Sequence, residues 1–426
     1  MVMGMKWRKV PIVTYRNLNK FFHLTYCTSI HPANGWSEVF ANLQRYAPAL
    51  KERIVPLADF GIGLRLSGQE SDELLQGNHL LQLQHFLQEQ RLYIFTLNGF
   101  SYGPFQQQPV KALVHAPDWR EEERVAYTLR LIAILAALLP DGVAGSISTS
   151  PLSYKAWVNE RDPGTWRTFT RNIVRVAETL IRVRRTYDKH IVLAIEPEPD
   201  GLLENCEEVV RFYTDWLFQE GVCMLACSLS VSVEMARQYL LEHIQVCLDT
   251  CHMALAYERP AQGLALLEQY GIRVGKVQIS SALKVAFPLE EELLVSLVDR
   301  AALVRALSPF TQSTYLHQVV QRNRNGAIRH YADLSDALLK MYERQIEQWR
   351  IHFHVPIFVN DYVDHGMRLF STQDTIVEML DLLVQKRFCR HLEIETYTWH
   401  VLPDALKHDI MDSIVHEYEW VLRRLP

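Results

Sequence analysis

Residues 244–252 read Ile-Gln-Val-Cys-Leu-Asp-Thr-Cys-His, an apolar run that ends at Asp249 and is followed three residues later by His252. A carboxylate and an imidazole at this spacing can bind a divalent metal or transfer protons. A simpler explanation also exists, because Asp249 can cap the turn that follows it. The chemistry therefore depends on what other segments bring to the same place.

Other apolar runs end in residues of the same kind. Glu196 and Glu198 end one run, Gln278 ends a second, and Glu395 ends a third. Carboxylates that converge from separate strands repel one another unless a cation neutralises them. Glu196, Asp249 and Glu395 therefore predict a site for Mn²⁺, Mg²⁺, Co²⁺ or Zn²⁺. In an enzyme, Glu196 and Glu395 would be the candidate bases, and His252 would orient a substrate oxygen.

Each of these residues has an alternative without chemistry. The segment Glu196–Pro199 is also compatible with an exposed turn. Glu393 and Glu395 alternate with apolar residues, so they also fit the polar face of a strand. The histidines at 317, 352 and 354 fit a structural role as well as a ligand role. The conjunction of these residues on successive strands, rather than any one of them, favours a site.

The elements that must position these residues are short apolar runs alternating with amphipathic helices. Such alternation is typical of parallel βαβ units, and the number of units favours a closed (β/α)₈ TIM barrel over an open sheet. The strands are predicted at 24–31, 60–67, 92–100, 143–150, 190–198, 245–252, 275–283 and 391–399. In such a barrel the active site lies at the carboxyl ends of the strands, which is where the acidic residues fall.

The alternation breaks after residue 283. Residues 314–331 read as a β-hairpin whose turn holds Asn325 and Gly326, and residues 350–358 are strand-like. We therefore expect one barrel domain over residues 1–426, with residues 310–365 as an insertion over the barrel mouth.

Composition excludes several classes of protein. The formal net charge of the 426-residue chain is −5, which disfavours a nucleic-acid partner. The 7 cysteines form no regular framework and are expected to be reduced, buried thiols. The longest apolar run, 131–139, is far too short to span a bilayer, and the basic N-terminus lacks the apolar core of a signal peptide. No transmembrane segment and a cytoplasmic location are expected.

Two resemblances refine this interpretation. The segments AIEPEP, CLDTCH, KVQISS and LEIET resemble strand ends of the xylose isomerase-like TIM-barrel superfamily, which includes sugar isomerases, epimerases and the endonuclease IV class. Over essentially the whole chain, the segments YCTSIHP, FGIGLRLS, TLNGFSYGPF, LHQVV, HFHVPIF and ETYTWHVLP resemble the E-protein family of the Ebo metabolite-traffic gene cluster.

The resemblance implies roles for individual residues. Glu196, Asp249, Gln278 and Glu395 fall on the four metal-ligand positions of the isomerase-like enzymes. The position of Gln278 is normally a histidine, and an amide oxygen is a weaker ligand for late transition metals. His252 falls on a histidine that contacts substrate, or a further metal in endonuclease IV. The residues expected to meet a small metabolite are His252, Glu198, Asn98, His31, His354 and Trp399.

Three functions follow as hypotheses. The first is a metal-dependent isomerase or epimerase acting on a small hydroxylated or carbonyl metabolite. The second is a non-catalytic protein that binds a secondary-metabolite precursor for export, with other proteins of the same metabolite-traffic system as partners. The third and weakest is a zinc phosphodiesterase like endonuclease IV, which uses further histidines that this chain lacks.

Overall fold

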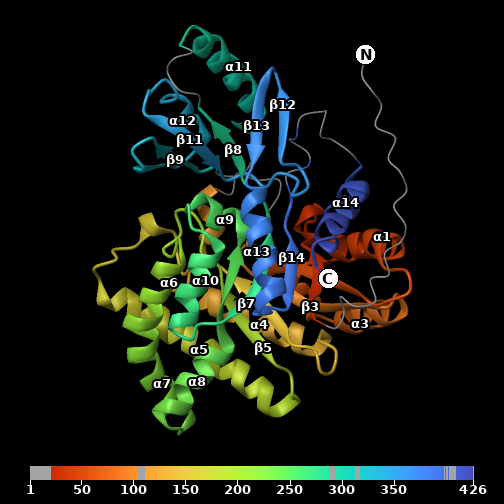
Figure 1. Ribbon diagram of the computed structural model, residues 1–426. Coiled ribbons are helices and arrows are strands. Elements are labelled where there is room, and N and C mark those ends of the chain that lie inside the picture. Colours follow the sequence, from red (N-terminus) through yellow and green to blue (C-terminus); the bar gives the residue numbers. More distant parts are fainter. Residues whose placement is uncertain are drawn as a thin grey trace.

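Eight parallel strands form a barrel in the computed structural model, which describes residues 21–103, 111–287, 293–311, 317–397, 399, 402 and 409–425 (Figure 1). The strand order is β1-β14-β7-β6-β5-β4-β3-β2, and every neighbouring pair is parallel. The strands are β1 (His23–Tyr26), β2 (Phe60–Arg65), β3 (Leu92–Asn98), β4 (Gly145–Thr149), β5 (Ile191–Ile195), β6 (Ile244–Asp249), β7 (Val274–Ile279) and β14 (His391–Ile394).

The barrel closes between β1 and β2. Cys27 and Gly63 form a parallel bridge, and the Gly63 N–H donates to Thr25 Oγ1 at 2.6 Å. Gly63 also leaves room for Glu393, because a Cβ at this position would lie 2.0 Å from Glu393 Oε1. The predicted TIM barrel is confirmed by this strand order.

Helices surround the barrel because each buries one apolar face against the sheet. Asp162, for example, caps α5 by accepting hydrogen bonds from two backbone N–H groups, and Pro163 occupies the first turn. The surrounding helices are α1 (Trp36–Ile54), α2 (Gly68–Leu74), α3 (His79–Glu89), α4 (Glu122–Leu138), α5 (Pro163–Tyr187), α6 (Cys206–Phe212), the π-helical turn Tyr213–Gly221, α7 (Val222–Leu229), α8 (Val233–His243), α9 (Thr250–Leu255), α10 (Pro260–Gln269), α13 (Gln373–Lys386) and α14 (Ile410–Leu422).

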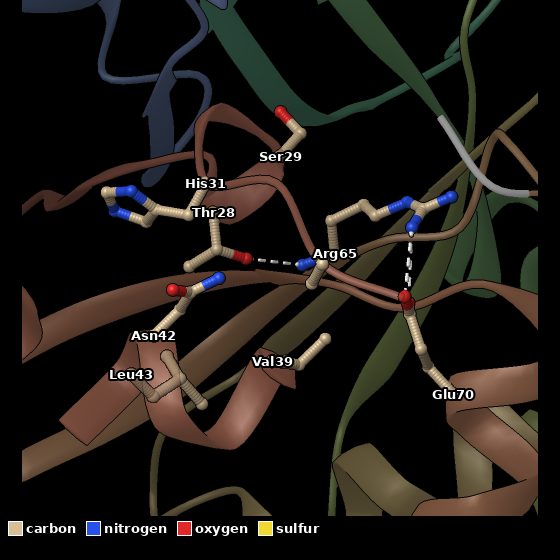
Figure 2. A pocket seen from close by; sticks show the side chains of 9 residues that line it. Thr28, Ser29, His31, Val39, Asn42, Leu43, Arg65 and Glu70 are labelled. Atoms are coloured by element: carbon tan, nitrogen blue, oxygen red, sulfur yellow. Dashed lines mark hydrogen bonds and ion pairs between the residues drawn. The ribbon is translucent and has the colours of Figure 1, made fainter. Parts of the chain in front are cut away.

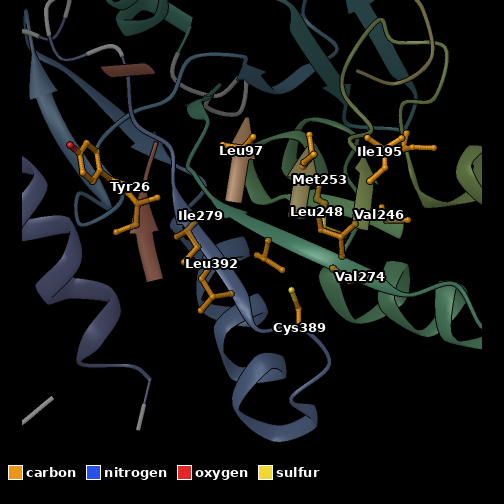
Figure 3. Close-up of a cluster of buried hydrophobic side chains, with 14 of the residues drawn as sticks. Tyr26, Leu97, Ile195, Val246, Leu248, Met253, Val274, Ile279, Cys389 and Leu392 are labelled. Carbon is orange, nitrogen blue, oxygen red and sulfur yellow. The ribbon is translucent and has the colours of Figure 1, made fainter. Parts of the chain in front are cut away.

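Side chains alternate along the strands between two environments. The outward positions, such as Val246, Leu248 and Leu392, pack into the apolar layer beneath the helices (Figure 3). The inward positions of β14 are polar: His391 Nδ1 lies 2.9 Å from Ser146 Oγ, and Glu393 forms an ion pair with Lys276. The polar face considered for the strand that carries Glu393 and Glu395 is therefore the face that lines the interior of the barrel.

A second sheet replaces the simple loop between β7 and α13. Its six strands are antiparallel, in the order β10-β9-β11-β8-β13-β12, and it lies above the barrel in Figure 1. We call residues 283–371 the cap. Its elements are β8 (Leu283–Ala286), α11 (Leu293–Thr311), β9 (Val319–Asn323), β10 (Ile328–Tyr331), α12 (Leu334–Leu338), β11 (Ile346–Ile351), β12 (Asp361–Asp364) and β13 (Met367–Ser371).

The cap is wider than the expected range of 310–365, because β8 and β13 pair with each other at its two ends. Strands β9 and β10 form the predicted hairpin, with Gly326 in the left-handed region at φ 83°. Residues 312–316 of the predicted excursion lie outside the described residues.

Two other expectations concern the surface and the N-terminus. Cys223 and Cys227 are exposed rather than buried, and the other five cysteines are buried as expected.

Within the described ranges, no single helix has the length and apolar character to span a bilayer, although the pair Cys206–Leu229 and Val233–His243, bent by 107°, meets both criteria jointly. The expected lack of a signal peptide concerns residues before 21, which lie outside the described residues.

Glu417 on α14 bonds residues of two other segments, and its ionisation should make the stability of the fold depend on pH. Its carboxylate accepts hydrogen bonds from Thr396 Oγ1 at 2.6 Å and from the Ile357 N–H at 3.3 Å. Burial raises the pKa of Glu417 to about 8, against the opposing effect of these two hydrogen bonds. Between pH 4.5 and this value the unfolded chain ionises while the folded chain keeps its proton, so stability falls as pH rises.

Glu417→Gln removes this ionisation. We expect the variant to gain stability relative to wild type by roughly 3–5 kcal/mol on going from about pH 4 to pH 8.5. Urea denaturation at both pH values measures the effect, with the exposed Glu160→Gln as control. A stability difference that does not change between the two pH values would contradict the prediction.

Candidate metal centre

Three buried carboxylates meet at the carboxyl end of the barrel. Glu196 follows β5, Asp249 ends β6, and Glu395 follows β14. One oxygen of each lies within 4.8 Å of the others, a spacing compatible with a shared metal ion. The three residues are between 1% and 8% exposed. The structure therefore brings together three of the four residues predicted to bind metal as a single acidic cluster.

Asp249 has a structural role as well as a place in this cluster. Its Oδ1 accepts hydrogen bonds from the backbone N–H groups of Cys251 and His252, and from Ser280 Oγ at 2.6 Å. Asp249 therefore has the capping role that was considered as an alternative. Oδ2 has no hydrogen-bond partner among the described residues, so one oxygen orients the side chain and the other is available for a ligand.

The ionisation of Asp249 differs from that of its neighbours. Burial by itself raises the pKa of Asp249, but the imidazoles of His252 and His354 and the hydrogen bond from Ser280 outweigh it and lower the pKa. Asp249 is therefore the member of the cluster that is held as an anion.

Glu196 and Glu395 are affected in the opposite direction. Burial, together with the other carboxylates, raises the pKa of both well above the ordinary value, and Lys276 only partly opposes this. Lys276 lies 2.6 Å from Glu393, so its charge is already matched. A cation bound among the carboxylates would supply the missing positive charge.

Glu395 and Glu196 differ in their hydrogen bonds. Glu395 Oε1 accepts from Asn98 Nδ2 at 3.2 Å, and Oε2 accepts from Gln278 Nε2 at 2.6 Å. Glu196 Oε2 is buried with no hydrogen-bond partner in the described part of the chain. A buried carboxylate oxygen without a partner is costly, and the same arrangement occurs at Asp249 Oδ2. Both unmet oxygens fit a hard divalent cation.

Gln278 is used differently from the fourth ligand suggested by its position. Its Oε1 accepts a hydrogen bond from Cys247 Sγ at 2.8 Å, and its Nε2 donates to Glu395. With Glu395 ionised, as it would be beside a bound cation, the carboxylate accepts from the amide nitrogen and leaves the amide oxygen to the thiol. In this arrangement Gln278 orients Glu395 through its nitrogen, and its oxygen is engaged by Cys247.

The cap adds histidines to the barrel mouth. His252, in the first turn of α9, lies with Nδ1 3.7 Å from Glu196 Oε1 and with Nε2 3.2 Å from His352 Nε2. His352 Nδ1 in turn donates to Gln318 Oε1 at 2.8 Å. His354 donates from Nδ1 to the Glu395 carbonyl at 2.5 Å. The structure therefore places His354 next to Glu395.

These histidines give the mouth further ligand groups. Asp249, His252 and His354 form one set with ligand atoms within 4.8 Å of each other, and Cys251, His352 and His354 form another. His352 was not among the predicted site residues. The alternation His-Phe-His in the strand-like run 350–358 was the signal for it, because residues two apart share a face.

Glu198 contacts a residue that sequence reasoning missed. His115, at the end of the short 3₁₀ helix Lys111–His115, lies with Nε2 2.9 Å from Glu198 Oε1. Glu198 Oε2 lies 4.0 Å from His252 Nε2. The signal for His115 was the length of the segment between β3 and α4, since long loops often carry function.

Two predicted substrate-binding residues, His31 and Trp399, have recorded partners other than the three carboxylates. His31 stacks on Tyr46 with ring centroids 3.9 Å apart, and its Nε2 lies 3.1 Å from Tyr26 Oη. It lines a small cavity together with the Arg65–Glu70 ion pair (Figure 2). Burial and, to a smaller extent, Arg45 lower the pKa of His31 to about 3. Trp399 packs against the Phe358 ring and donates to the Thr396 carbonyl. Neither residue contacts the three carboxylates through any recorded interaction.

Comparison with known proteins adds resemblances of fold. No family model matches the chain, and no curated protein sequence matches it. Among solved structures, a xylose isomerase-like TIM barrel protein from Mycobacterium smegmatis in complex with magnesium is 10% identical, with 95% of this chain and 97% of that chain covered and a TM-score of 0.47. A probable 3-DHS dehydratase, AsbF, from Bacillus anthracis is 11% identical, with 93% and 97% covered and a TM-score of 0.44.

A D-tagatose 3-epimerase-like protein is 11% identical, with 94% of this chain and 98% of that chain covered and a TM-score of 0.42. Sequence identities of 10% to 11% do not support assigning the roles of residues in these proteins to residues of this chain. The class of fold rests on the strand order, which defines a TIM barrel with an acidic cluster at its carboxyl end.

Proposed function

We propose that this protein is a metal-dependent enzyme acting on a small hydroxylated or carbonyl metabolite, with isomerase- or epimerase-type chemistry. The observation that carries the proposal is the cluster of Glu196, Asp249 and Glu395, three buried carboxylates whose ligand atoms lie within 4.8 Å of one another. Such a cluster is unstable as three anions, and a divalent cation relieves the repulsion. Its place at the carboxyl end of a TIM barrel supports a catalytic site.

A divalent cation bound here would polarise a carbonyl oxygen and a neighbouring hydroxyl oxygen of the metabolite. The C–H bond next to the carbonyl would then be more acidic. The residues of the chain have separate tasks around it. Asp249 is held as an anion by its cap and by Ser280, and Gln278 and Asn98 fix Glu395. His252 lies close enough to Glu196 to hydrogen-bond a substrate oxygen beside that carboxylate.

Elemental analysis of the purified protein tests the proposal. We expect about one Mn²⁺ or Mg²⁺ per chain, because three carboxylate oxygens favour hard cations. Removal of the ion by a chelator should lower the melting temperature, and the ion should restore it. Gln278→His should shift preference towards Zn²⁺ or Co²⁺, since imidazole suits these metals. A metal-free protein whose melting temperature ignores both chelator and added metal would overturn the proposal.

Gln278 favours a second candidate function. An amide that orients Glu395 supplies no imidazole to the cluster, so a late transition metal would be held less tightly, and a protein that only holds a metabolite needs no such metal. In that case the protein would hold a secondary-metabolite precursor in the cytoplasm for export, with other proteins of the same metabolite-traffic system as partners. Asp249→Ala separates the two candidates once a ligand is found: lost turnover with retained binding supports the enzyme.

A further inference from the structure

The contact between His115 and Glu198 has no part in the metal cluster described above. His115 is 1% exposed, and its Nε2 lies 2.9 Å from Glu198 Oε1. A ring nitrogen this close to a carboxylate oxygen is placed to carry the proton, so in the neutral tautomer the lone pair lies at Nδ1. Nδ1 is buried and has no hydrogen-bond partner among the described residues.

A buried nitrogen lone pair without a partner is destabilising, because the group has lost its hydrogen bond to water. Packing does not explain why a histidine occupies this position, because an apolar ring would fill the same space without leaving a nitrogen unpaired. The histidine is explained if a ligand supplies a hydrogen-bond donor to Nδ1. The arrangement, in which a carboxylate orients one ring nitrogen and leaves the other as an acceptor, is the arrangement that activates an imidazole as a general base.

The position of the pair connects it with the metal cluster. Glu198 Oε2 lies 4.0 Å from His252 Nε2, and His252 Nδ1 lies 3.7 Å from Glu196 Oε1. On the other side, the His115 ring contacts the aromatic rings of Phe100, Tyr154 and Trp157, with centroids 5.4 to 6.5 Å away. Trp157 is 37% exposed, so this aromatic group extends from the His115 ring to the surface.

We propose that His115, oriented by Glu198, is a second acid-base residue of this site and accepts a proton at Nδ1 from a ligand whose vicinal oxygens bind the metal. The ligand is an α-hydroxycarbonyl compound with an apolar or ring face directed at Phe100, Tyr154 and Trp157. The inference rests on the proposed metal site.

The proton transfer is balanced within the site. The C–H bond beside the carbonyl breaks, its electron pair becomes part of the enediolate, and the proton forms a new N–H bond at Nδ1 while Nε2–H continues to donate to Glu198. Return of the same proton to the neighbouring carbon, while the hydroxyl proton moves from one ligand oxygen to the other, completes an isomerisation.

Acetohydroxamate provides a test without turnover, because it presents two vicinal oxygens to a metal and must lose a proton to resemble an enediolate. Binding to the Mn²⁺-loaded protein is measured by calorimetry in two buffers of different ionisation enthalpy, which gives the number of protons released. In wild type His115 takes the proton, so we expect almost none in the buffer. In His115→Gln we expect about one proton released and affinity reduced about tenfold to a hundredfold.

Glutamine at 115 can still donate to Glu198 but cannot accept a proton at the position of Nδ1, so the variant separates proton transfer from packing. His243→Gln is the matched control, since His243 is equally buried and bonds only the Ile191 carbonyl at the other end of β5 among its recorded contacts. This control should bind and release protons as wild type does.

The outcomes separate the two proposals. Equal proton release and equal affinity in wild type and His115→Gln would overturn the role of His115, as would failure of acetohydroxamate to bind a wild-type protein that holds Mn²⁺. Normal Mn²⁺ content in His115→Gln is expected, because His115 belongs to none of the candidate ligand sets. Absence of Mn²⁺ binding in wild type would instead overturn the proposed function itself.

Discussion

Asp249→Asn is expected to lower the affinity of the protein for Mn²⁺ by at least about a hundredfold, because loss of a partner outside the ligand shell alone typically costs 10–100-fold. Asp249 is the carboxylate held as an anion, and its Oδ2 has no hydrogen-bond partner among the described residues. The substitution removes its charge and one anionic oxygen. Calorimetric titration of the chelator-treated protein with Mn²⁺ measures the change.

The fold should survive this substitution. Asparagine is as good a helix cap as aspartate, so the hydrogen bonds from the Cys251 and His252 N–H groups can be kept. Asp162→Asn is a matched control, since Asp162 caps α5 in the same way and is not in a candidate metal group. An Asp249→Asn protein that binds Mn²⁺ like wild type would show that the acidic cluster is not the metal centre.

The affinity for Mn²⁺ measured in the same titration should rise with pH. Burial and neighbouring carboxylates raise the pKa of Glu196 and Glu395, so without a cation these groups retain protons near neutral pH. Mn²⁺ must displace them, and each displaced proton makes the affinity rise about tenfold per pH unit. An affinity that is constant between about pH 6 and 8, or that falls, would contradict the ionisation inferred for the cluster.

Lys276→Met is expected to lower the free energy of unfolding by about 3–5 kcal/mol, the usual cost of removing one partner from a buried ion pair. Lys276 Nζ lies 2.6 Å from Glu393 Oε2, and both side chains are fully buried inside the barrel. Burial alone lowers the pKa of Lys276, but Glu393 and the nearby thiols reverse this, and the net pKa is raised. Without Lys276 the Glu393 carboxylate is left uncompensated.

A double variant tests the cause. Lys276→Met combined with Glu393→Gln removes both charges, so most of the lost stability should return. Urea denaturation of the two variants measures the difference. If the double variant is as unstable as Lys276→Met, then packing of the lysine stem rather than the ion pair holds this layer of the barrel together.

The barrel and much of its acidic mouth could be predicted because they depend on local periodicity. Alternating apolar positions fix which residues of a strand point inwards, and parallel βαβ units place the carboxyl ends of all strands on one face. Glu196, Asp249 and Glu395 therefore meet whatever the details of packing. Asn98 was predicted at the mouth for the same reason, and it donates to Glu395.

The cap was harder to predict because its pairing is not local. Strand β8 pairs with β11 and β13, which follow it by about sixty and more than eighty residues in the chain. The hairpin at Asn325 and Gly326 has a turn signal of its own and was found from sequence. The way the cap brings His352 to His252 follows from the long-range pairing and has no local signal beyond the His-Phe-His alternation.

The class of fold and the convergence of three carboxylates on one end of it could be read from local pattern, because strand alternation and chain handedness act residue by residue. The orientation of Gln278, the stacking partners of His31 and Trp399, and the approach of His115 to Glu198 became visible only in the folded chain. These contacts depend on which side chains from distant segments fill the same space, and hydrogen-bond geometry then selects among them.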